Sequence, residues 1–377
     1  MAVFRLILLV VGGIFAIYLA QQLSQFEGAT FVGKLLFSIF AFSVIFMSIL
    51  LPLLFWSEEG RKNVAKWAGL QRSSFYTMAF SGVLLTFVVA RDVIEFLNSF
   101  FKWFPENVTY QLPITGLFIA LSFFIVLLGR KRVAAGPSLK KVELAARAFG
   151  LTNRLKILQI SDLHISEFVS AEFITGVVQR SMAEKPDLIM LTGDIVDGDV
   201  DLLKDKIKLL KGLSAPLGLY FVTGNHEFFW NAKKISTALE ALGVHVLNNS
   251  WRELQFQNDS IVIAGVEDPM ARFGGGVGPS FADFKTLQQK EAFKILLAHQ
   301  PQVADEAAKH GFHLQLSGHT HGGQFFPWNL LIGFAQKYSR GLYRVDSMYL
   351  YVNQGTAFWG PDIRHGTECE ISVIQIQ

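Results

Sequence analysis

The chain holds a single cysteine, Cys369, which excludes an intrachain disulfide framework. Charge is scarce at the start of the chain. The first 130 residues contain nine Lys/Arg and six Asp/Glu, and no histidine precedes His164. Residues 131–377 hold the other 25 Lys/Arg and 25 Asp/Glu, so the second part of the chain is neutral. Because neither part is strongly basic, we expect no nucleic-acid partner.

Apolar residues, by contrast, are abundant. They make up 51% of the chain, and the mean hydropathy is +0.35, which is high for a soluble protein. Four apolar stretches each reach about the 18–20 residues that cross a hydrocarbon core of ~30 Å. They lie at about 3–23, 31–56, 75–97 and 112–129. Any one of them could be a buried core helix, but four in succession predict a four-helix transmembrane anchor over residues 1–130.

The distribution of basic residues between these stretches predicts the orientation of the anchor. The segment 57–74 carries Arg61, Lys62, Lys66 and Arg72, and basic residues also follow the fourth stretch. The segment 25–30 has none. Since short cytoplasmic loops are enriched in Lys and Arg, we expect both termini and everything after the fourth stretch on the cytoplasmic side of a multi-pass membrane protein.

The pattern changes after residue 130. Residues 131–154 form a predicted linker with a short amphipathic helix at Val142–Ala148, and 155–377 form a predicted domain. Short apolar runs that indicate buried strands lie at 155–160, 188–191, 218–222, 261–264 and 295–298. Helical segments lie at 171–183, 202–211, 232–242, 284–291 and 303–309. Further strands are expected at 342–345, 348–352 and 370–376. Strands that alternate with helices predict a layered α/β domain.

Side chains of metal-binding type follow four of these apolar runs and one further run, 312–316. They are Asp162 and His164, then Asp194, then Asn225 and His226, then His299, and finally His319 and His321 after the run 312–316. In α/β sheets, ligands bind outside the carboxyl ends of strands, so these groups can converge. A lone histidine at a strand end is more often structural. The prediction of a metal site therefore rests on the complete set of residues in this order and not on any single histidine.

The number of converging groups predicts two metal ions. Two carboxylates, one amide oxygen and up to five imidazoles exceed the three or four protein ligands of one zinc ion. Two ions about 3.5–4 Å apart are typical of phosphoryl displacement, because they stabilise both the attacking and the leaving oxygen. Ligation by nitrogen and oxygen without thiolate favours Mn, with Fe or Zn as alternatives.

These motifs resemble those of the calcineurin-like metallophosphoesterases. The resemblance covers residues 155–377 and rests on five motifs. They are Asp162-Leu163-His164, Gly193-Asp194, Gly224-Asn225-His226-Glu227, His299 and Gly318-His319-Thr320-His321. The segments Gly322-Gly323-Gln324 and Arg340-Gly341-Leu342-Tyr343 look like the bacterial, membrane-associated YkuE-like branch. The resemblance implies a four-layer αββα sandwich with a dinuclear centre at its edge.

The resemblance also implies roles. Asp162, His164 and His321 would hold the first metal, Asp194 would bridge, and Asn225, His299 and His319 would hold the second. His226 would not bind metal; it would contact the phosphate and protonate the leaving oxygen. A metal-activated hydroxide would then attack phosphorus. Arg340 and Arg364 are candidate substrate contacts.

The sequence as a whole predicts a phosphoesterase anchored in the bacterial inner membrane. It would hydrolyse a phosphoester or pyrophosphate bond in a phosphorylated or nucleotide-linked lipid, such as UDP-2,3-diacylglucosamine. Its partners would be the bilayer and this substrate, and the oligomeric state is left open. The apolar run 325–334, directly after the metal-binding histidines, is either a lipid-contacting loop or ordinary core. The alternative function is a membrane sensor or scaffold that retains the metal-binding fold without activity.

Overall fold

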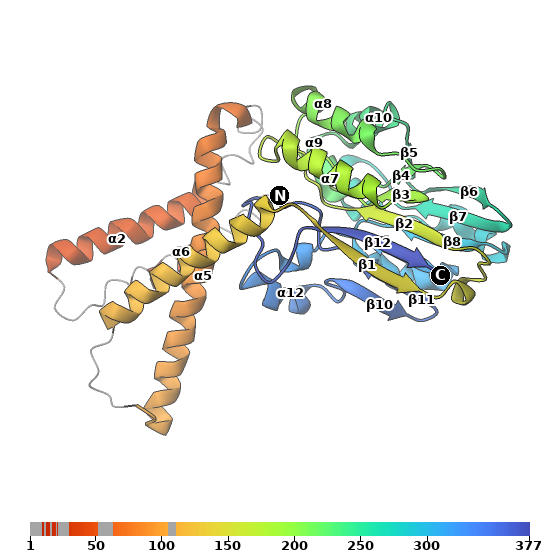
Figure 1. Ribbon diagram of the computed structural model, residues 1–377. Coiled ribbons are helices and arrows are strands. Elements are labelled where there is room, and N and C mark those ends of the chain that lie inside the picture. The colour runs from red at the N-terminus through yellow and green to blue at the C-terminus, as the bar shows by residue number, and fades with distance from the viewer. Residues whose placement is uncertain are drawn as a thin grey trace. The chain divides into compact units, whose positions relative to one another are not determined.

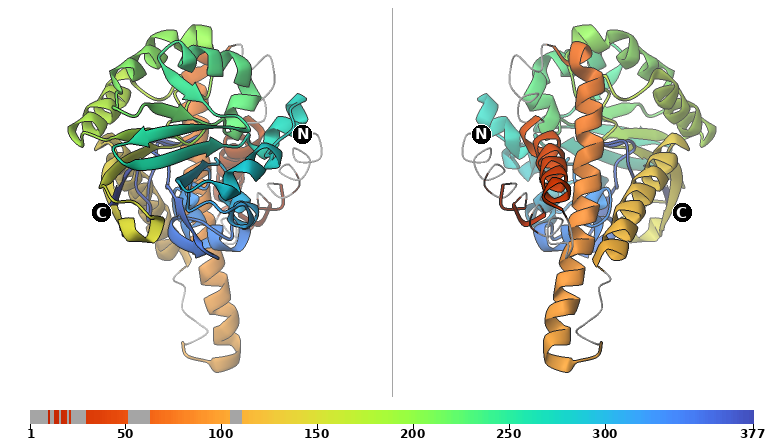
Figure 2. Two further views of the ribbon diagram at one scale, coloured as in Figure 1. Left: turned by 90° about the vertical axis from the view of Figure 1, so that its right-hand side faces the viewer. Right: turned by 90° about the vertical axis from the view of Figure 1, so that its left-hand side faces the viewer.

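The computed structural model describes residues 30–51, 63–104 and 111–377, together with several residues between 10 and 21. The chain forms two compact units (Figures 1 and 2). The first comprises Met1–Lys131 with Phe325–Pro327, and the second comprises Arg132–Gln324 with Trp328–Gln377.

The first unit is helical. Its described helices are α2 (Phe31–Ile45), which continues into the π-helical turn η1 (Phe46–Leu50), α5 (Val64–Phe101) and α6 (Gln111–Ala134). Thr30 caps α2, because its hydroxyl accepts a hydrogen bond from the backbone N–H of Gly33 at 3.2 Å. Two segments, Phe31–Ser48 and Ile114–Ala134, are long and apolar enough to cross a membrane.

The prediction of four membrane spans was therefore wrong for the described residues, which contain two such segments. The predicted third span, 75–97, lies within α5, but α5 begins at Val64 and extends over the segment expected to be a loop. Its charged residues make it less apolar than α2; they are Lys66, Arg72, Arg91, Asp92 and Glu95. The predicted first span, 3–23, and the basic residues Arg61 and Lys62 lie largely or wholly outside the described residues.

The second unit contains two mixed six-stranded sheets. The first has the order β1-β12-β2-β3-β4-β5. Its strands are β1 (Ser138–Leu144), β2 (Leu155–Ile160), β3 (Leu188–Leu191), β4 (Leu219–Phe221), β5 (Val244–Val246) and β12 (Glu370–Ile376). Strands β2 to β5 run parallel, whereas β12 is antiparallel to β2.

Three helices cover the outer face of the first sheet (Figure 1). They are α7 (Ala171–Ala183), α8 (Val200–Lys208) and α10 (Ala232–Glu240), and the 3-10 turn η3 (Leu209–Gly212) follows α8. Each helix begins at a residue whose side chain accepts a backbone N–H: Ser170, Asp199 and Asn231. These caps fix where each helix starts after its preceding strand and loop.

The second sheet has the order β10-β11-β9-β8-β7-β6. Its strands are β6 (Ser250–Phe256), β7 (Asp259–Gly265), β8 (Phe293–Leu297), β9 (Leu314–Ser317), β10 (Gly341–Val345) and β11 (Met348–Val352). Short helical segments provide residues to the core on its outer face. They include η5 (Ala282–Gln289), η6 (Pro301–Val303), α11 (Ala304–Ala307) and η7 (Ala308–His310).

Side chains along a strand point alternately to the two faces of the sheet, and this alternation places them in different layers of the core. In β2, Leu155 and Ile157 face the core between the two sheets, whereas Leu158 and Ile160 face the helices. Both faces of β2 are therefore covered, which explains why its apolar residues do not alternate strictly with polar ones. The layers follow the order helix, sheet, sheet, helix.

The predicted amphipathic helix at 142–148 is absent. Residues 138–144 form β1, which pairs in parallel with β12, and the 3-10 turn η2 (Ala146–Phe149) follows. The partner strand lies more than 200 residues away in sequence, so no local signal could show this pairing. As a result, the second unit begins at Arg132 and includes most of the predicted linker. Strands β5 and β6 were also not predicted from the sequence.

Candidate metal centre

The predicted metal ligands converge at the carboxyl ends of β2, β3, β4, β8 and β9. The structure brings them together in three overlapping groups of His and Asp side chains whose potential ligand atoms lie within 4.8 Å of one another. The groups are Asp162, His164 and His321; Asp194, His299 and His319; and His164, Asp197 and His226. The first two match the two predicted metal sites, while the third contains Asp197, which the sequence analysis did not identify.

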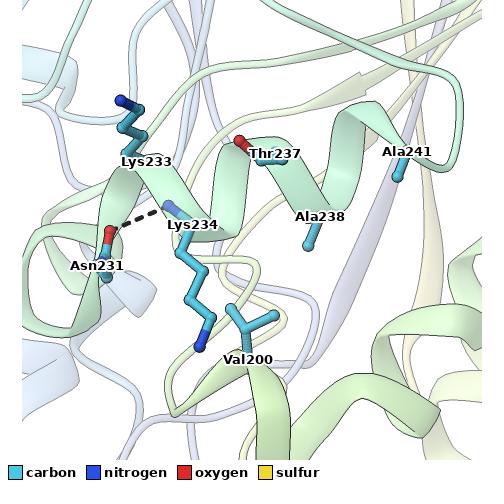
Figure 3. A pocket seen from close by; sticks show the side chains of 7 residues that line it. All are labelled: Val200, Asn231, Lys233, Lys234, Thr237, Ala238 and Ala241. Atoms are coloured by element: carbon cyan, nitrogen blue, oxygen red, sulfur yellow. Dashed lines mark hydrogen bonds between the residues drawn. The ribbon is translucent and has the colours of Figure 1, made fainter.

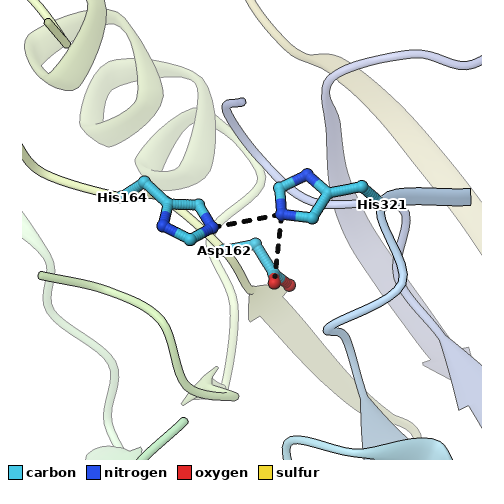
Figure 4. A group of neighbouring side chains, drawn as sticks. All are labelled: Asp162, His164 and His321. Carbon is cyan, nitrogen blue, oxygen red and sulfur yellow. Dashed lines mark hydrogen bonds and ion pairs between the residues drawn. The ribbon is translucent and has the colours of Figure 1, made fainter. Parts of the chain in front are cut away.

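The first group joins residues that follow β2 and β9 (Figure 4). His164 Nε2 lies 3.1 Å from His321 Nε2, and His321 Nε2 lies 3.4 Å from Asp162 Oδ1. All three side chains are buried. Two imidazole nitrogens and a carboxylate oxygen thus face one point.

The second group joins residues that follow β3, β4, β8 and β9. His299 Nε2 lies 3.2 Å from both Asp194 Oδ2 and Asn225 Oδ1. His319 Nδ1 lies 2.9 Å from the same Asn225 oxygen. Asn225 is the first residue of α9 (Asn225–Trp230), so it reaches this group from the start of a helix.

Asp194 lies between the two groups. Its Oδ2 is 3.2 Å from His299 Nε2 of the second group and 3.9 Å from His164 Nε2 of the first. A single carboxylate within reach of both sets is the geometry that a bridging ligand requires. Burial would raise the pKa of Asp194, but His299 and His226 outweigh burial and hold it well below its usual range.

His226 pairs with Asp197 and is not a member of either of the first two groups. His226 Nδ1 lies 2.9 Å from Asp197 Oδ1, and His164 Nδ1 lies 3.3 Å from Asp197 Oδ2. Asp197 also accepts a hydrogen bond from Trp230 Nε1 at 2.8 Å. A carboxylate shared by a metal-binding histidine and a candidate acid orients both rings. The available sequence signal was a second aspartate three residues after Asp194.

The electrostatics of His226 suit a proton donor. Burial alone would lower its pKa, but Asp197 and Asp194 outweigh burial and raise it to about 9. His226 Nε2 lies 4.0 Å from Asp194 Oδ2, so the proton-bearing ring stands beside the bridging position. Its side chain is 12% exposed, which makes it more accessible than the buried ligands.

Backbone conformation around the centre is unusual for non-glycine residues. Positive φ angles occur at Asp162 (52°), His164 (44°), Asp194 (51°), His319 (71°) and His321 (51°). Left-handed conformations cost energy for such residues and concentrate at functional sites. These turns aim consecutive ligands of one strand end at different places: His321 joins the first group and His319 the second.

Two glycines permit the close approach of these loops. A Cβ atom at Gly224 would lie 2.2 Å from Asp194 Oδ1, and one at Gly318 would lie 1.9 Å from the Ser161 hydroxyl oxygen. Any larger residue would displace the ligand loops, because real Cβ atoms do not come that close to other atoms.

The chemistry of the donor set fits divalent cations. His299 Nδ1 faces the carbonyl oxygen of Thr192 at 2.8 Å, so Nδ1 carries the proton and Nε2 presents its lone pair in the neutral ring. That lone pair meets two acceptor oxygens, those of Asn225 and Asp194. Burial would lower the pKa of His299, but Asp194 and Asp162 raise it well above its usual range. The pocket thus favours positive charge at the point where a cation would bind.

The sequence of this chain is similar to those of known proteins. Residues 155–323 match the calcineurin-like phosphoesterase family. An uncharacterized metallophosphoesterase of Helicobacter pylori is 30% identical over 80% of this chain and 79% of its own length. The chain belongs to the calcineurin-like metallophosphoesterases. The uncharacterized metallophosphoesterase YkuE of Bacillus subtilis is 31% identical over 59% of this chain and 79% of its own length. A bovine "transmembrane protein with metallophosphoesterase domain" is 28% identical over 83% of this chain and 80% of its own length.

The metallophosphoesterase fold and the metal-binding clusters make this chain a metal-dependent hydrolase. Its candidate ligands are the residues predicted from the sequence. A shallow groove between α8 and α10, lined by Asn231, Lys234 and Thr237, includes none of these ligands (Figure 3).

Glu227 fixes the backbone of two loops that carry candidate metal ligands. Its buried carboxylate accepts hydrogen bonds from the backbone N–H groups of Asp194 (2.9 Å), Ile195 (2.8 Å), Val196 (3.1 Å) and Gly224 (2.7 Å). One side chain thus fixes the loop of the bridging ligand and the start of α9. The sequence analysis treated this residue only as part of a motif.

Glu227→Gln is expected to lower the free energy of unfolding by about 2–6 kcal/mol. Each carboxylate oxygen accepts two backbone donors, so replacing either oxygen with NH2 leaves two buried donors unpaired, at about 1–3 kcal/mol each. Urea unfolding of the metal-free protein measures this change. The exposed Glu306→Gln is the matched control and should change stability by less than about 0.5 kcal/mol. Equal effects of the two substitutions would contradict the role of Glu227.

The structure does not place Arg364 where it could contact a substrate. It is fully buried and donates to the carbonyl oxygens of His321, Gln354 and Ala357, with Nη2 2.9 Å from His321 Nδ1. Its hydrogen bond to the His321 carbonyl oxygen fixes the backbone of His321, whose ring lies with Nε2 3.4 Å from Asp162 Oδ1. The other candidate, Arg340, is exposed and donates to the carbonyl oxygen of Gly366 at 3.0 Å. Its exposure is compatible with the predicted contact to the substrate.

Arg364→Lys is expected to weaken metal binding by about 10–100-fold, the range found when supporting residues of metal ligands are changed. A lysine has one donor nitrogen and cannot span several carbonyl groups and an imidazole at once. Calorimetric titration of the metal-free protein with Mn2+ measures the affinity. The control is Arg340→Lys, which should leave metal affinity unchanged. If Arg364→Lys also leaves it unchanged, Arg364 does not position His321.

Proposed function

We propose that this chain is a membrane-anchored phosphoesterase that acts on a phosphorylated or nucleotide-linked lipid at the cytoplasmic face of a bacterial inner membrane. The observation that carries the proposal is the position of Asp194 between two complete sets of imidazole and carboxylate ligands. Asp162, His164 and His321 would hold one divalent cation. Asn225, His299 and His319 would hold the other, and Asp194 would be shared.

Two bound cations would supply Lewis-acid stabilisation of phosphate oxygens and a water of lowered pKa. The protein's own residues do the rest. Asp197 holds His226 Nδ1, which leaves Nε2 as the donor that faces the centre. A protonated His226 can then give its proton to the leaving oxygen as the phosphorus–oxygen bond breaks. The neutral His319 ring, whose pKa is lowered to about 3 by burial and by the nearby His299, keeps its lone pair for a cation.

Membrane attachment is supported by the two segments long enough to span a bilayer and by the similarity to a relative named as transmembrane. Arg130, Lys131 and Arg132 lie near the end of α6 and favour a cytoplasmic position for the catalytic unit. Ala135, Gly136 and Pro137 alone separate α6 from β1. A catalytic unit held so close to a membrane helix favours a substrate embedded in the same membrane.

The test is a comparison of substrates. The full chain, purified in detergent with Mn2+, is assayed with p-nitrophenyl phosphate, bis-p-nitrophenyl phosphate and UDP-2,3-diacylglucosamine, and again with Fe2+ or Zn2+ in place of Mn2+. We expect the lipid substrate to have the highest kcat/KM. Preference for a soluble ester would overturn the lipid assignment. No turnover of any substrate by the metal-loaded protein would favour the sensor or scaffold function.

A further inference from the structure

The helix α12 (Trp328–Ala335) presents apolar side chains to the outside. None of its residues is buried, and Phe334 is 91% and Leu330 64% exposed. Trp328 and Leu331 are also exposed. Large apolar side chains that cluster on one short element, unlike single exposed ones, indicate an interaction surface. From the sequence this run could be core or a lipid-contacting loop, and its exposure excludes the core interpretation for α12.

The surroundings of α12 make the surface apolar throughout. No charged residue lies between Gln324 and Lys337. The first residues of α12 pack on η8 (His321–Gly323): a Cβ at Gly323 would lie 2.4 Å from the carbonyl oxygen of Trp328. A Cβ at Gly366 would lie 2.1 Å from Asn329 Nδ2. The helix is therefore fixed directly beside the metal ligand His321.

A lipid bilayer fits this surface better than a water-soluble partner. The end of α6, a candidate membrane span, precedes β1 by only Ala135, Gly136 and Pro137, so the second unit is tethered close to the bilayer surface if α6 spans it. A surface so tethered meets lipid at high effective concentration. Tryptophan, leucine and phenylalanine are the side chains that interfacial helices insert, and tryptophan favours the interface itself.

We propose that α12 inserts its Trp328, Leu330, Leu331 and Phe334 side chains into the bilayer and so holds the metal centre at the lipid surface. This inference rests on the membrane attachment proposed above, but it does not depend on hydrolysis. It assigns α12 a partner, the acyl region of the bilayer. It also explains why such an apolar helix follows directly after a metal ligand in the sequence.

The test measures the depth of α12 in proteoliposomes of the full chain. Phe334→Cys is labelled with an environment-sensitive fluorophore, and nitroxide-bearing lipids or aqueous iodide are used as quenchers. The native Cys369 is buried, so the unsubstituted protein serves as the labelling blank. Leu202→Cys on α8 is the matched control, because Leu202 is a similarly exposed apolar residue, at 68%. Alkaline carbonate extraction of the same membranes tests attachment independently.

We expect the label at position 334 to lose most of its fluorescence to nitroxide lipids and little to iodide, with the opposite result at position 202. Strong iodide quenching at 334 in carbonate-resistant protein would overturn the insertion of α12 while leaving the anchor intact. Protection from both quenchers would mean that protein covers α12, which also overturns the inference. Release of the chain by carbonate would refute the membrane attachment and the inference with it.

Discussion

Asp194→Asn is expected to lower kcat/KM by at least about 10³-fold. Asp194 is the one ligand within reach of both groups, and metal ions contribute several kcal/mol to the transition state, where about 1.4 kcal/mol is a factor of ten. The amide removes one negative charge from the position that both ligand groups share, so each cation would be held less tightly. Steady-state assays together with metal analysis by mass spectrometry measure both consequences.

The matched control is Asp205→Asn, since the Asp205 side chain is 82% exposed on α8 and pairs only with Lys208 among the contacts described. That variant should retain wild-type kcat/KM and metal content. Turnover that survives Asp194→Asn, in protein that still binds two metal ions, would contradict the bridging role.

His226→Asn is expected to lower kcat by about 10²–10⁴-fold, the usual contribution of a positioned general acid. The loss should be larger for an alkyl phosphoester than for a p-nitrophenyl ester, because p-nitrophenolate leaves without a proton. Metal content should stay unchanged, since His226 faces Asp197 and is absent from both ligand groups. Equal losses for both leaving groups would contradict the role of His226 as a proton donor.

The pH dependence gives a separate test of the His226–Asp197 pair. Only protonated His226 can donate, so activity should fall as the pH rises through its pKa, which is about 9 in the metal-free protein. Bound cations would lower that pKa. Asp197 raises it, so Asp197→Asn should move the alkaline limb of the kcat profile to lower pH. An unchanged limb, or a move to higher pH, would contradict the pairing.

Much of the catalytic unit could be predicted from the sequence because its strands are buried on both faces. Runs such as 155–160 and 188–191 have no polar alternation, and the structure places them at β2 and β3 with the predicted bounds. The ligand residues could be predicted for a related reason. Each stands directly after such a run, and parallel strands deliver their carboxyl ends to one edge.

Two of the wrong predictions, those for β1 and Arg364, have a common cause, which is dependence on distant partners. β1 forms only because β12 is available beside it, and the local pattern of 142–148 is helical instead. The four predicted spans counted apolar length alone, and the charges of α5 were given too little weight. Arg364 was predicted to contact the substrate, but it is buried and donates to the carbonyl oxygen of His321, more than forty residues away in sequence, so it supports His321 instead.

The sequence by itself determined the family, the α/β class and the set of metal-binding residues, because these depend on residue type and order along the chain. The family resemblance implied how the set is divided, but only the tertiary structure shows the geometry of that division. Positive φ angles at His319 and His321 send neighbouring side chains to different groups, and the loop contacts place Asp194 between them. The tertiary structure also decided that Glu227 and Asp197 orient the centre and that α12 is exposed. Those facts depend on which segments meet in space, and no single segment of sequence encodes that.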